Sequence, residues 1–414
     1  MSSLKTLARE AKAAAAETAV AGTERKDTAL KAMAARLLAD MDGILKANDM
    51  DLHAARLNGL SDAMCERLTL NEERIRNMAD GILAVMAQND PIGEVLDGCT
   101  RPNGLKIKHV RVPLGVVGII FESRPNVTSD AAALCIKAGN ACVLRGGKEA
   151  INSNLSIAAS LQEGLAEAGL PKSAICMVSD TSRESAAEMM RLNGLIDVLI
   201  PRGGAGLIKA VVENSSLPVI ETGSGNCHLY IDSEADADMA ADIAENAKCS
   251  RPSVCNSVET LLIHKDRAAE LLPVIQRRFA AYNVVWYGCE QTRAILKDAL
   301  PVTEEHYYTE FNDFTIACRI VDSIQDAVRH IRRYSSGHSE CIVTDSCKNA
   351  DYFTSAIDSA AVYVNASTRF TDGGEFGLGA EIGISTQKLH ARGPMGILAL
   401  TSGKYIISGG GQIR

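Results

Sequence analysis

Apolar residues recur at helical spacing through the first part of the chain. Between residues 3 and 90 the sequence is rich in Ala, Glu, Lys, Arg and Leu, and apolar positions return every three or four residues. Examples of these positions are Leu30, Met33, Leu37, Leu38 and Met41. Thr69 followed by Glu72 has the spacing of a capping box, which predicts the start of a helix that ends near Gln88. The pattern predicts a helical N-terminal region.

From residue 116 to 221 the pattern changes to short apolar runs separated by helical stretches. The apolar runs that predict strands are 116–121, 141–145, 174–178, 196–200 and 218–221. The stretches that predict helices are 129–138, 151–168, 182–192 and 204–213. This alternation is typical of a doubly wound parallel sheet.

A second alternating region follows, with helices between its predicted strands. These strands are 228–231, 258–264, 314–321, 341–344 and 361–365. The repetition predicts an α/β protein with two Rossmann-like parallel-sheet domains, residues 1–224 and 225–390, and an active site in the cleft between them.

Two further segments fall outside these domains. Residues 106–112 alternate charged and apolar side chains, as a half-exposed strand does, and predict a hairpin at 103–114. Residues 403–414 contain Tyr405-Ile406-Ile407 and a glycine run, and are too short to fold alone. We expect residues 391–414 to be an oligomerisation segment that adds an edge strand to another subunit, with the hairpin as a candidate partner.

Composition narrows the classes of function. The chain has 414 residues, of which 46% are hydrophobic and 23% charged, as in ordinary globular proteins. A net charge of −8 and the lack of a dense Lys/Arg run argue against nucleic acid as a partner. We find no signal-peptide core and no run of about 18 apolar residues, and therefore expect a cytoplasmic protein without a membrane partner.

The cysteines favour reduced thiols. There are 12 of them in a long chain, several in apolar runs, and no C-x-x-C pair occurs. This spacing supports neither a disulfide scaffold nor a thiolate metal site, so no metal is expected.

Cys255 stands apart from the other cysteines. It lies in a polar segment, Arg251 to Ser257, directly before the strand predicted at 258–264, where a substrate could reach it. Free cysteine is often buried as a small apolar residue, so core packing is the alternative. Two polar residues elsewhere favour a nucleophile. Asn126 could donate to an oxyanion or merely form a turn, and Glu221 could act as a base or be an ordinary loop carboxylate.

Two glycine turns follow predicted strands and are candidates for holding a phosphate. Gly203-Gly204 stands between a strand and a helix, and Gly146-Gly147 is flanked by Arg145 and Lys148. The G-x-G-x-x-G fingerprint is absent, and a plain tight turn is the alternative at 203–206. Two basic side chains beside two glycines favour an anion such as the ribose phosphate of NADPH.

Several motifs together resemble the aldehyde dehydrogenase superfamily. They are Ser123-Arg124-Pro125-Asn126, Glu221-Thr222-Gly223, Cys255 and Glu375-Phe376-Gly377. A second set resembles, more closely and over essentially the whole chain, the γ-glutamyl phosphate reductases within that superfamily. It comprises Phe121 to Thr128, Ile200 to Gly204, Glu221 to His228, Gly337 to Glu340 and Gly411 to Arg414.

The resemblance implies an aldehyde dehydrogenase-like fold with a small oligomerisation extension. The implied activity is NADPH-dependent reduction of L-glutamyl 5-phosphate to L-glutamate 5-semialdehyde and phosphate, through a cysteine thioester. This is the second step of proline biosynthesis from glutamate. The implied partners are the acyl phosphate substrate, further copies of the chain as a homo-oligomer, and functional coupling to glutamate 5-kinase.

The resemblance also implies roles for individual residues. Cys255 takes the nucleophile position, Asn126 the oxyanion position and Glu310 the position that holds the nicotinamide ribose. Glu221 matches the carboxylate that activates water in hydrolytic aldehyde dehydrogenases. The residues expected at the cofactor are Arg145, Gly146, Gly147, Lys148, Gly203, Gly204 and Glu310.

The substrate's phosphate and carboxylate both need cations near Cys255. The candidates are Arg124, Arg251, Arg369 and Arg392, each of which could instead form a structural ion pair, and His338 as a hydrogen-bond donor. An acylating dehydrogenase that uses coenzyme A is the alternative enzyme. A catalytically silent scaffold is the alternative class, and the intact Cys255 and Asn126 argue against it.

Overall fold

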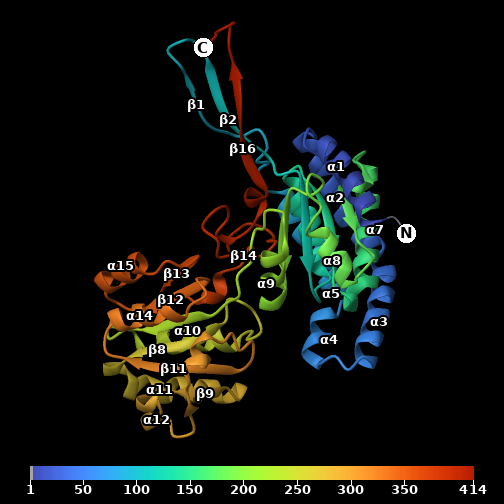
Figure 1. Cartoon of the computed structure of the whole chain (residues 1–414). Helices are drawn as coiled ribbons and strands as arrows, with labels where there is room; N and C mark the ends of the chain where they lie inside the picture. Colours follow the sequence, from blue (N-terminus) through green and yellow to red (C-terminus); the bar gives the residue numbers. More distant parts are fainter. Residues whose placement is uncertain (1–2) are drawn as a thin grey trace. The chain divides into compact units, whose positions relative to one another are not determined.

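The computed structural model describes residues 3–414, and the chain divides into two compact units. The N-terminal unit holds the residues up to Thr222 together with Gly377–Gly383 and Pro394–Arg414. The Cys255 unit holds Gly223–Phe376 and Ile384–Gly393. Each unit contains a parallel sheet with helices around it, which confirms the predicted α/β class (Figure 1). Over residues 3–414, no helix is both long enough and apolar enough to cross a membrane.

The N-terminal unit begins with helices, as the helical spacing predicts. They are α1 (Leu4–Thr18), α2 (Thr23–Ala39), α3 (Met41–Leu57), α4 (Asp62–Leu68) and α5 (Glu72–Met86). Leu30, Met33 and Leu37 are fully buried on one face of α2, whereas Leu38 is 41% exposed. The period of 3.6 residues thus separates buried from exposed positions.

The start of α5 differs from the prediction. Asn71 is its N-cap, and the Asn71 side chain accepts a hydrogen bond of 2.8 Å from the N–H of Arg74. Thr69 instead ends α4, where its hydroxyl donates to the carbonyl of Cys65 at 2.8 Å. The predicted capping box at Thr69 is therefore wrong, because asparagine two residues later satisfies the orphan N–H groups of the helix.

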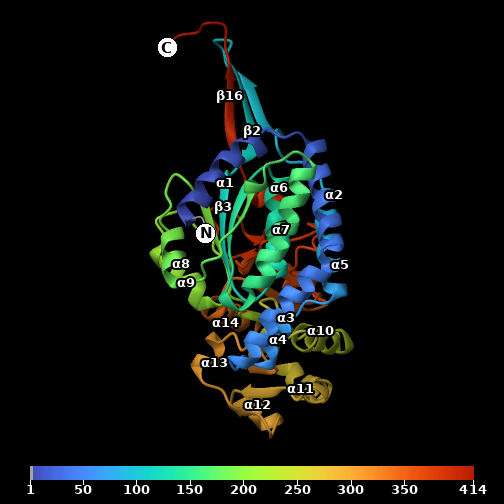
Figure 2. The ribbon, with the colours of Figure 1, turned by 90° about the vertical axis from the view of Figure 1, so that its right-hand side faces the viewer.

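A four-stranded parallel sheet forms the core of the N-terminal unit (Figure 2). In the order β5-β4-β3-β6, its strands are β5 (Ile175–Met177), β4 (Ala141–Arg145), β3 (Val116–Phe121) and β6 (Val198–Arg202). The helices that follow these strands are α6 (Asn126–Lys137), α7 (Ile151–Glu167), α8 (Arg183–Met189) and α9 (Ala205–Asn214), with short 3-10 turns at η1 (Lys148–Ala150) and η2 (Lys172–Ala174). The strand predicted at 218–221 is only an isolated bridge between Val219 and Leu199.

A separate antiparallel sheet, the arm, also belongs to the N-terminal unit. Its strands are β1 (Val95–Thr100), β2 (Lys106–Pro113) and β16 (Thr401–Ser408), with β2 in the middle. β16 pairs with β2 of the same chain, from Thr401 opposite Pro113 to Ser408 opposite Lys106. The hairpin that was the candidate partner of the C-terminal strand thus pairs with it within one chain, and the outer edge of β16 stays unpaired in the sheet order. That this segment also joins another subunit stays a prediction. The 3-10 turn η5 (Ile397–Leu400) leads into β16.

The Cys255 unit is built on a seven-stranded parallel sheet. In the order β10-β9-β11-β8-β7-β12-β13, its strands are β10 (Leu300–Pro301), β9 (Val285–Gly288), β11 (Thr315–Val321), β8 (Val258–His264), β7 (Cys227–Ile231), β12 (Ser339–Val343) and β13 (Ala361–Val364). Its helices are α10 (Ala237–Cys249), α11 (Lys265–Phe279), α12 (Glu290–Ile295), α13 (Glu304–Tyr308), α14 (Ile324–Tyr334) and α15 (Cys347–Ala356). Its 3-10 turns are η3 (Ala280–Tyr282) and η4 (Thr368–Phe370), and two short strands follow later, β14 (Ile384–Ser385) and β15 (Gly393–Pro394). Strands β9 and β10 are not among the strands predicted from the sequence.

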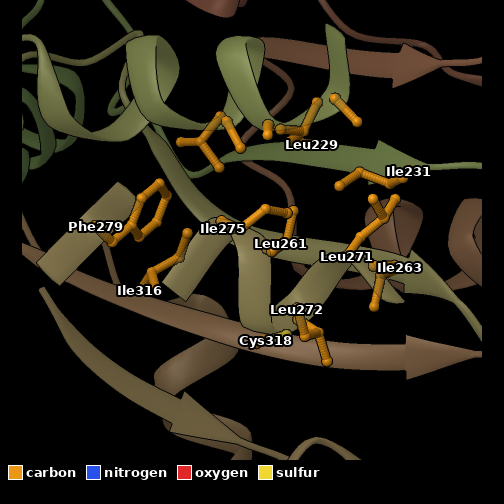
Figure 3. Close-up of a cluster of buried hydrophobic side chains, with 14 of the residues drawn as sticks. Leu229, Ile231, Leu261, Ile263, Leu271, Leu272, Ile275, Phe279, Ile316 and Cys318 are labelled. Atoms are coloured by element: carbon orange, nitrogen blue, oxygen red, sulfur yellow. The ribbon is translucent and has the colours of Figure 1, made fainter. Parts of the chain in front are cut away.

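Strand β8 is buried on both faces. Leu261 and Ile263 belong to the cluster in which α11 packs its Leu271, Ile275 and neighbouring side chains on the sheet (Figure 3). Leu262, between them, points into a different cluster with residues of α14 and α15. The two faces alternate along the strand, as the strand period of two requires. β8 is thereby fixed in place, and with it the turn that precedes it.

A buried ion pair also holds β8 and the turn before it in place. Lys248 at the end of α10 and Glu259 on β8 lie 2.6 Å apart, and both side chains are fully buried. Burial raises the pKa of Glu259 to about 7, although the charge of Lys248 acts in the opposite direction. The pair joins the helix before the Cys255 turn to the strand after it.

The buried ring of His330 makes the stability of the Cys255 unit depend on pH. Its ring is 3% exposed, and its Nδ1 lies 3.1 Å from Nη1 of Arg319. A guanidinium only donates hydrogen bonds, so this nitrogen accepts and the ring is neutral. Burial first, and then the electrostatic effects of His228, Arg319 and Arg333, lower the pKa of His330 to about 2.

In the unfolded chain, His330 takes up a proton below pH of about 6.5, and the folded state does not. The contribution of His330 to the free energy of unfolding is therefore fully present above that pH and decreases as the pH falls. We expect the chain to lose about 2 kcal/mol between pH 7 and pH 5 through this group alone. Thermal and urea unfolding of the wild type and of His330→Gln at both pH values test this. An equal loss in both proteins would contradict it.

Candidate active site

Cys255 lies in a turn between the end of α10 and the start of β8, as predicted. Its side chain is half-buried. By contrast, burial raises the pKa of the thiols of Cys176, Cys249, Cys318 and Cys341 to about 12. A thiol with so high a pKa carries almost no thiolate at neutral pH, and the thiolate is the nucleophile. Exposure therefore sets Cys255 apart from these other cysteines of the chain.

The segment before β7 packs directly on the Cys255 backbone. A Cβ on Gly225 would overlap the carbonyl group of Cys255 and lie 2.6 Å from its Cα, so only glycine fits there. The thiol of Cys227 donates to the same carbonyl oxygen at 3.2 Å. The N–H of Gly225 donates to Oε1 of Glu310 at 2.9 Å. Glu310, the predicted ribose-binding residue, is thus linked to the Cys255 turn through Gly225.

Arg369 interacts electrostatically with Cys255, and Arg251 interacts electrostatically with Arg369. Burial lowers the pKa of Arg369, and the positive charge of Arg251 acts in the same direction. Negative charge on Asp372 and on Cys255 acts the other way. A guanidinium that interacts with the candidate thiolate, with a second guanidinium close to the first, suits an anionic substrate.

The other two side chains proposed for substrate in this unit have different surroundings. His338 is fully buried, with Nδ1 2.8 Å from the Ser339 hydroxyl and 3.7 Å from the Cys227 thiol. Arg392 is paired with Asp358 at 2.8 Å, which is the structural ion pair considered as its alternative. The substrate role of His338 stays a prediction.

In the N-terminal unit, both glycine turns stand where the sequence places them. Gly203-Gly204 joins β6 to α9, and the N–H of Gly204 donates to the carboxylate of Glu122 at 2.9 Å. Gly146-Gly147 follows β4, and Glu149 beside it accepts from the N–H and hydroxyl of Ser123 at 3.0 and 2.6 Å. Each turn therefore has a carboxylate of its own chain against it.

Arg145 and Lys148 differ in their surroundings. Nη2 of Arg145 donates to the carbonyls of Thr181 and Ser182 at 2.6 and 2.8 Å, and burial lowers its pKa. Its Nε is buried and has no hydrogen-bond partner among residues 3–414. Lys148 is exposed at the start of η1. The pair thus combines an anchored cation with an exposed one.

Asn126 is the exposed first residue of α6. Its side-chain amide donates to the carboxylate of Asp130 at 2.9 Å, and burial raises the pKa of Asp130 to about 6. Arg124 and Glu221 are both half-buried. All three belong to the N-terminal unit, so their roles toward Cys255 stay predictions. No group of three or more His, Cys, Asp or Glu side chains within the described residues could hold a metal ion.

Comparison with known proteins agrees with this arrangement. Residues 4–289 match the model of the aldehyde dehydrogenase family. A gamma-glutamyl phosphate reductase of Carboxydothermus hydrogenoformans is 58% identical over the full length of both chains. One of Caldanaerobacter subterraneus is 54% identical over 98% of both.

The chain belongs to the γ-glutamyl phosphate reductases of the aldehyde dehydrogenase family.

Solved structures support the same family. The crystal structure of the γ-glutamyl phosphate reductase of Thermotoga maritima is 45% identical to this chain, covers 99% of both and gives a TM-score of 0.95. An acetylating aldehyde dehydrogenase of Geobacillus thermoglucosidasius shares the fold at 18% identity, with a TM-score of 0.72. The predictions of an aldehyde dehydrogenase-like fold and of an oxidoreductase are confirmed.

Three neighbours of Cys255 have contacts that the sequence does not predict. Gly225 and Cys227 belong to the motif Glu221 to His228, and Asn256 belongs to the polar segment that contains Cys255. A glycine before a buried strand and a polar residue directly after the nucleophile were the available signals. Neither signal tells which distant backbone these residues contact.

Proposed function

We propose that this chain reduces L-glutamyl 5-phosphate to L-glutamate 5-semialdehyde and phosphate with NADPH, the second step of proline biosynthesis from glutamate. The observation that carries the proposal is the half-buried Cys255, which interacts electrostatically with Arg369, a guanidinium that has Arg251 as a second cation close to it. The names of full-length relatives at 54–58% identity support it. The proposed compartment is the cytoplasm, and functional coupling to glutamate 5-kinase is part of the same proposal.

The proposed chemistry starts with the Cys255 thiolate. It attacks the acyl carbon of the substrate, the bond from that carbon to the phosphate oxygen breaks, and phosphate leaves with the electron pair. The product is a thioester on Sγ. Arg251 and Arg369 offset the charge of the phosphate as it approaches and departs. Bound NADPH supplies the hydride that reduces the thioester carbon, and cleavage of the resulting hemithioacetal returns the thiolate and releases the aldehyde.

Two residues of the N-terminal unit have proposed roles in this chemistry. The Asn126 amide donates to the oxyanion that forms when the thiolate adds to the acyl group. Glu221 is retained as a candidate base for the thiol. Activation of water by Glu221, as in hydrolytic relatives, would release the acyl group as a carboxylate and does not suit a reductase.

The family uses a nicotinamide dinucleotide, and the residues of the two glycine turns fit one. A Cβ on Gly203 would meet the side chain of Glu122 at 2.5 Å, and Arg145 has a buried donor nitrogen without a partner in the described chain. We propose that Arg145 and Lys148 hold the adenosine ribose phosphate of NADPH, that Gly146, Gly147, Gly203 and Gly204 provide backbone N–H groups, and that Glu310 holds the nicotinamide ribose. A diphosphate at Gly204 would compete with Glu122 for its N–H.

We also propose that the chain is a homo-oligomer assembled through the arm. Tyr405, Ile406 and Ile407 on β16 are 61%, 45% and 60% exposed. β1 and β16 are both edge strands, and exposed apolar edges are pairing sites for another chain.

The substrate is tested in the reverse direction. We expect the purified chain to form NADPH from glutamate 5-semialdehyde and NADP⁺ only when inorganic phosphate is added. The same assay with coenzyme A in place of phosphate is the control, and the absorbance of NADPH is the readout. Activity that needs coenzyme A and ignores phosphate would overturn the proposal in favour of an acylating dehydrogenase.

A further inference from the structure

Asn256, the residue directly after the candidate nucleophile, is almost completely buried. It is 4% exposed and lies against the segment Ser367–Asp372, which follows β13 and contains η4. Its position in sequence makes any constraint on Asn256 a constraint on Cys255, because the two share a peptide bond.

Every hydrogen-bonding group of the Asn256 side chain is engaged. Nδ2 donates to the carbonyls of Arg369 and Thr371 at 3.2 and 2.9 Å. Oδ1 accepts from Nη1 of Arg369. The two donors and the acceptor of an amide are thereby used, and the orientation of the amide is fixed. A flipped amide would direct its oxygen at two carbonyls and its NH₂ at a guanidinium.

The backbone of Asn256 is held as well. Its carbonyl accepts from the hydroxyl of Thr368 at 2.6 Å. The segment that provides these contacts is itself anchored to the sheet, because the Thr371 hydroxyl lies 2.7 Å from the hydroxyls of Ser339 on β12 and Tyr363 on β13. The Cys255 turn and the 367–372 segment therefore form one hydrogen-bonded body.

Arg369 is aimed by the same contacts. Besides its bond to Asn256, its Nε donates to the hydroxyl of Ser250 at 3.2 Å. The guanidinium is thus held from both sides of Cys255 in sequence, by Ser250 and Asn256. It interacts electrostatically with the Cys255 thiol and with Arg251. A long side chain held in this way keeps its charge in one place and pays little rotamer entropy when an anion binds.

We infer that Asn256 is a positioning residue that holds the Arg369 guanidinium beside Cys255, so that an anionic substrate meets the thiol and the cation in a fixed arrangement. The inference rests on the proposed function for its substrate, an acyl phosphate. Its physical content, the placement of one charge next to one thiol, does not depend on that substrate.

The test compares two alkylating reagents at Cys255. Iodoacetate is anionic and iodoacetamide is neutral, and both form the same type of bond to sulfur. The ratio of their rates therefore reports the positive charge close to the thiol, whatever the general accessibility of the turn. Modification of Cys255 is followed by peptide mass analysis, because the chain has 12 cysteines.

Asn256→Ala is expected to lower the iodoacetate-to-iodoacetamide ratio at least threefold, close to the ratio in Arg369→Gln. It is also expected to raise the KM for phosphate at least tenfold in the reverse assay. Thr368→Val, which removes only the hydroxyl donor to the Asn256 carbonyl, is a milder variant in case Asn256→Ala folds poorly, and Thr368→Ser should restore the wild-type values.

Asn140→Ala is the matched control. Asn140 is fully buried and also joins two backbone segments, since Nδ2 donates to the carbonyl of Leu400 at 2.9 Å and Oδ1 accepts from the N–H of Gly115 at 2.8 Å. It should lower the melting temperature and leave the alkylation ratio unchanged. If Asn256→Ala and Thr368→Val are folded and keep the wild-type ratio, Asn256 is only structural and the inference fails. A wild type that ignores phosphate but shows the expected ratios would refute the proposed substrate alone.

Discussion

Replacement of Cys255 by alanine is expected to reduce the phosphate-dependent oxidation of glutamate 5-semialdehyde by about 10³-fold or more, since removal of a covalent nucleophile leaves only binding and electrostatic contributions. The contacts that shape the turn do not use the thiol: the Cys255 carbonyl accepts from Cys227, and the following residue, Asn256, donates to the carbonyl of Thr371. Folding and NADPH binding should therefore persist.

Activity, melting temperature and NADPH fluorescence, measured on the same preparation, separate loss of the nucleophile from loss of structure. Cys289→Ala is the matched control. Cys289 is also half-buried in the Cys255 unit, but its thiol lies 3.2 Å from the Thr292 hydroxyl at the start of α12. The control should keep its activity. Turnover that survives in Cys255→Ala would show that the nucleophile is a different group.

Replacement of Gly225 by alanine is expected to abolish most activity although the new side chain is a single methyl group. That methyl group would overlap the Cys255 carbonyl, and backbone atoms cannot move aside as the end of a flexible side chain can. The Cys255 turn must shift, and with it the thiol and the contact between Gly225 and Glu310. We expect at least a 100-fold loss of kcat, because misplacement of a reacting group by about 1 Å costs that much.

Overpacking of this kind also destabilises a protein by about 1–3 kcal/mol. Gly43→Ala is the control, because a Cβ there meets nothing within 4 Å and the residue lies inside helix α3. It should preserve activity and slightly raise the melting temperature. The prediction is tested by measuring kcat and the melting temperature of both variants. A fully active Gly225→Ala would mean that the Cys255 turn tolerates displacement.

Local patterns predicted much of the fold. The continuous apolar run Val116–Phe121 lies in a parallel sheet because only burial on both faces suits such a run, and the apolar Leu261, Leu262 and Ile263 of β8 are buried in the same way. β9 was missed because its four residues, Val285–Gly288, are too few to show a period. The start of α5 was misplaced because both Thr69 and Asn71 are good caps, and the choice depends on where the preceding helix ends.

The candidate site was predictable to the extent that it depends on motifs. Cys255 and Glu310 could be named, and Arg369 proposed, from residue type and resemblance. The hydrogen bonds that hold these residues in place could not be predicted, because they come from residues more than a hundred positions away. An example is the bond from the Thr368 hydroxyl to the Asn256 carbonyl. A hydrogen bond between distant segments leaves no periodic trace in a single sequence. For β16 the edge-strand pattern indicated the hairpin as a candidate partner, but not that both belong to the same chain.

The pairing of β16 with β2 has a consequence for biosynthesis. β2 can pair with β1 as soon as the hairpin has been synthesised. Its other edge stays unpaired until the ribosome has added residues 401–408. During most of translation the growing chain therefore carries an open strand edge, the kind of feature that invites premature association. A message truncated shortly before codon 401 would encode both parallel sheets and still yield a polypeptide with that edge permanently uncovered.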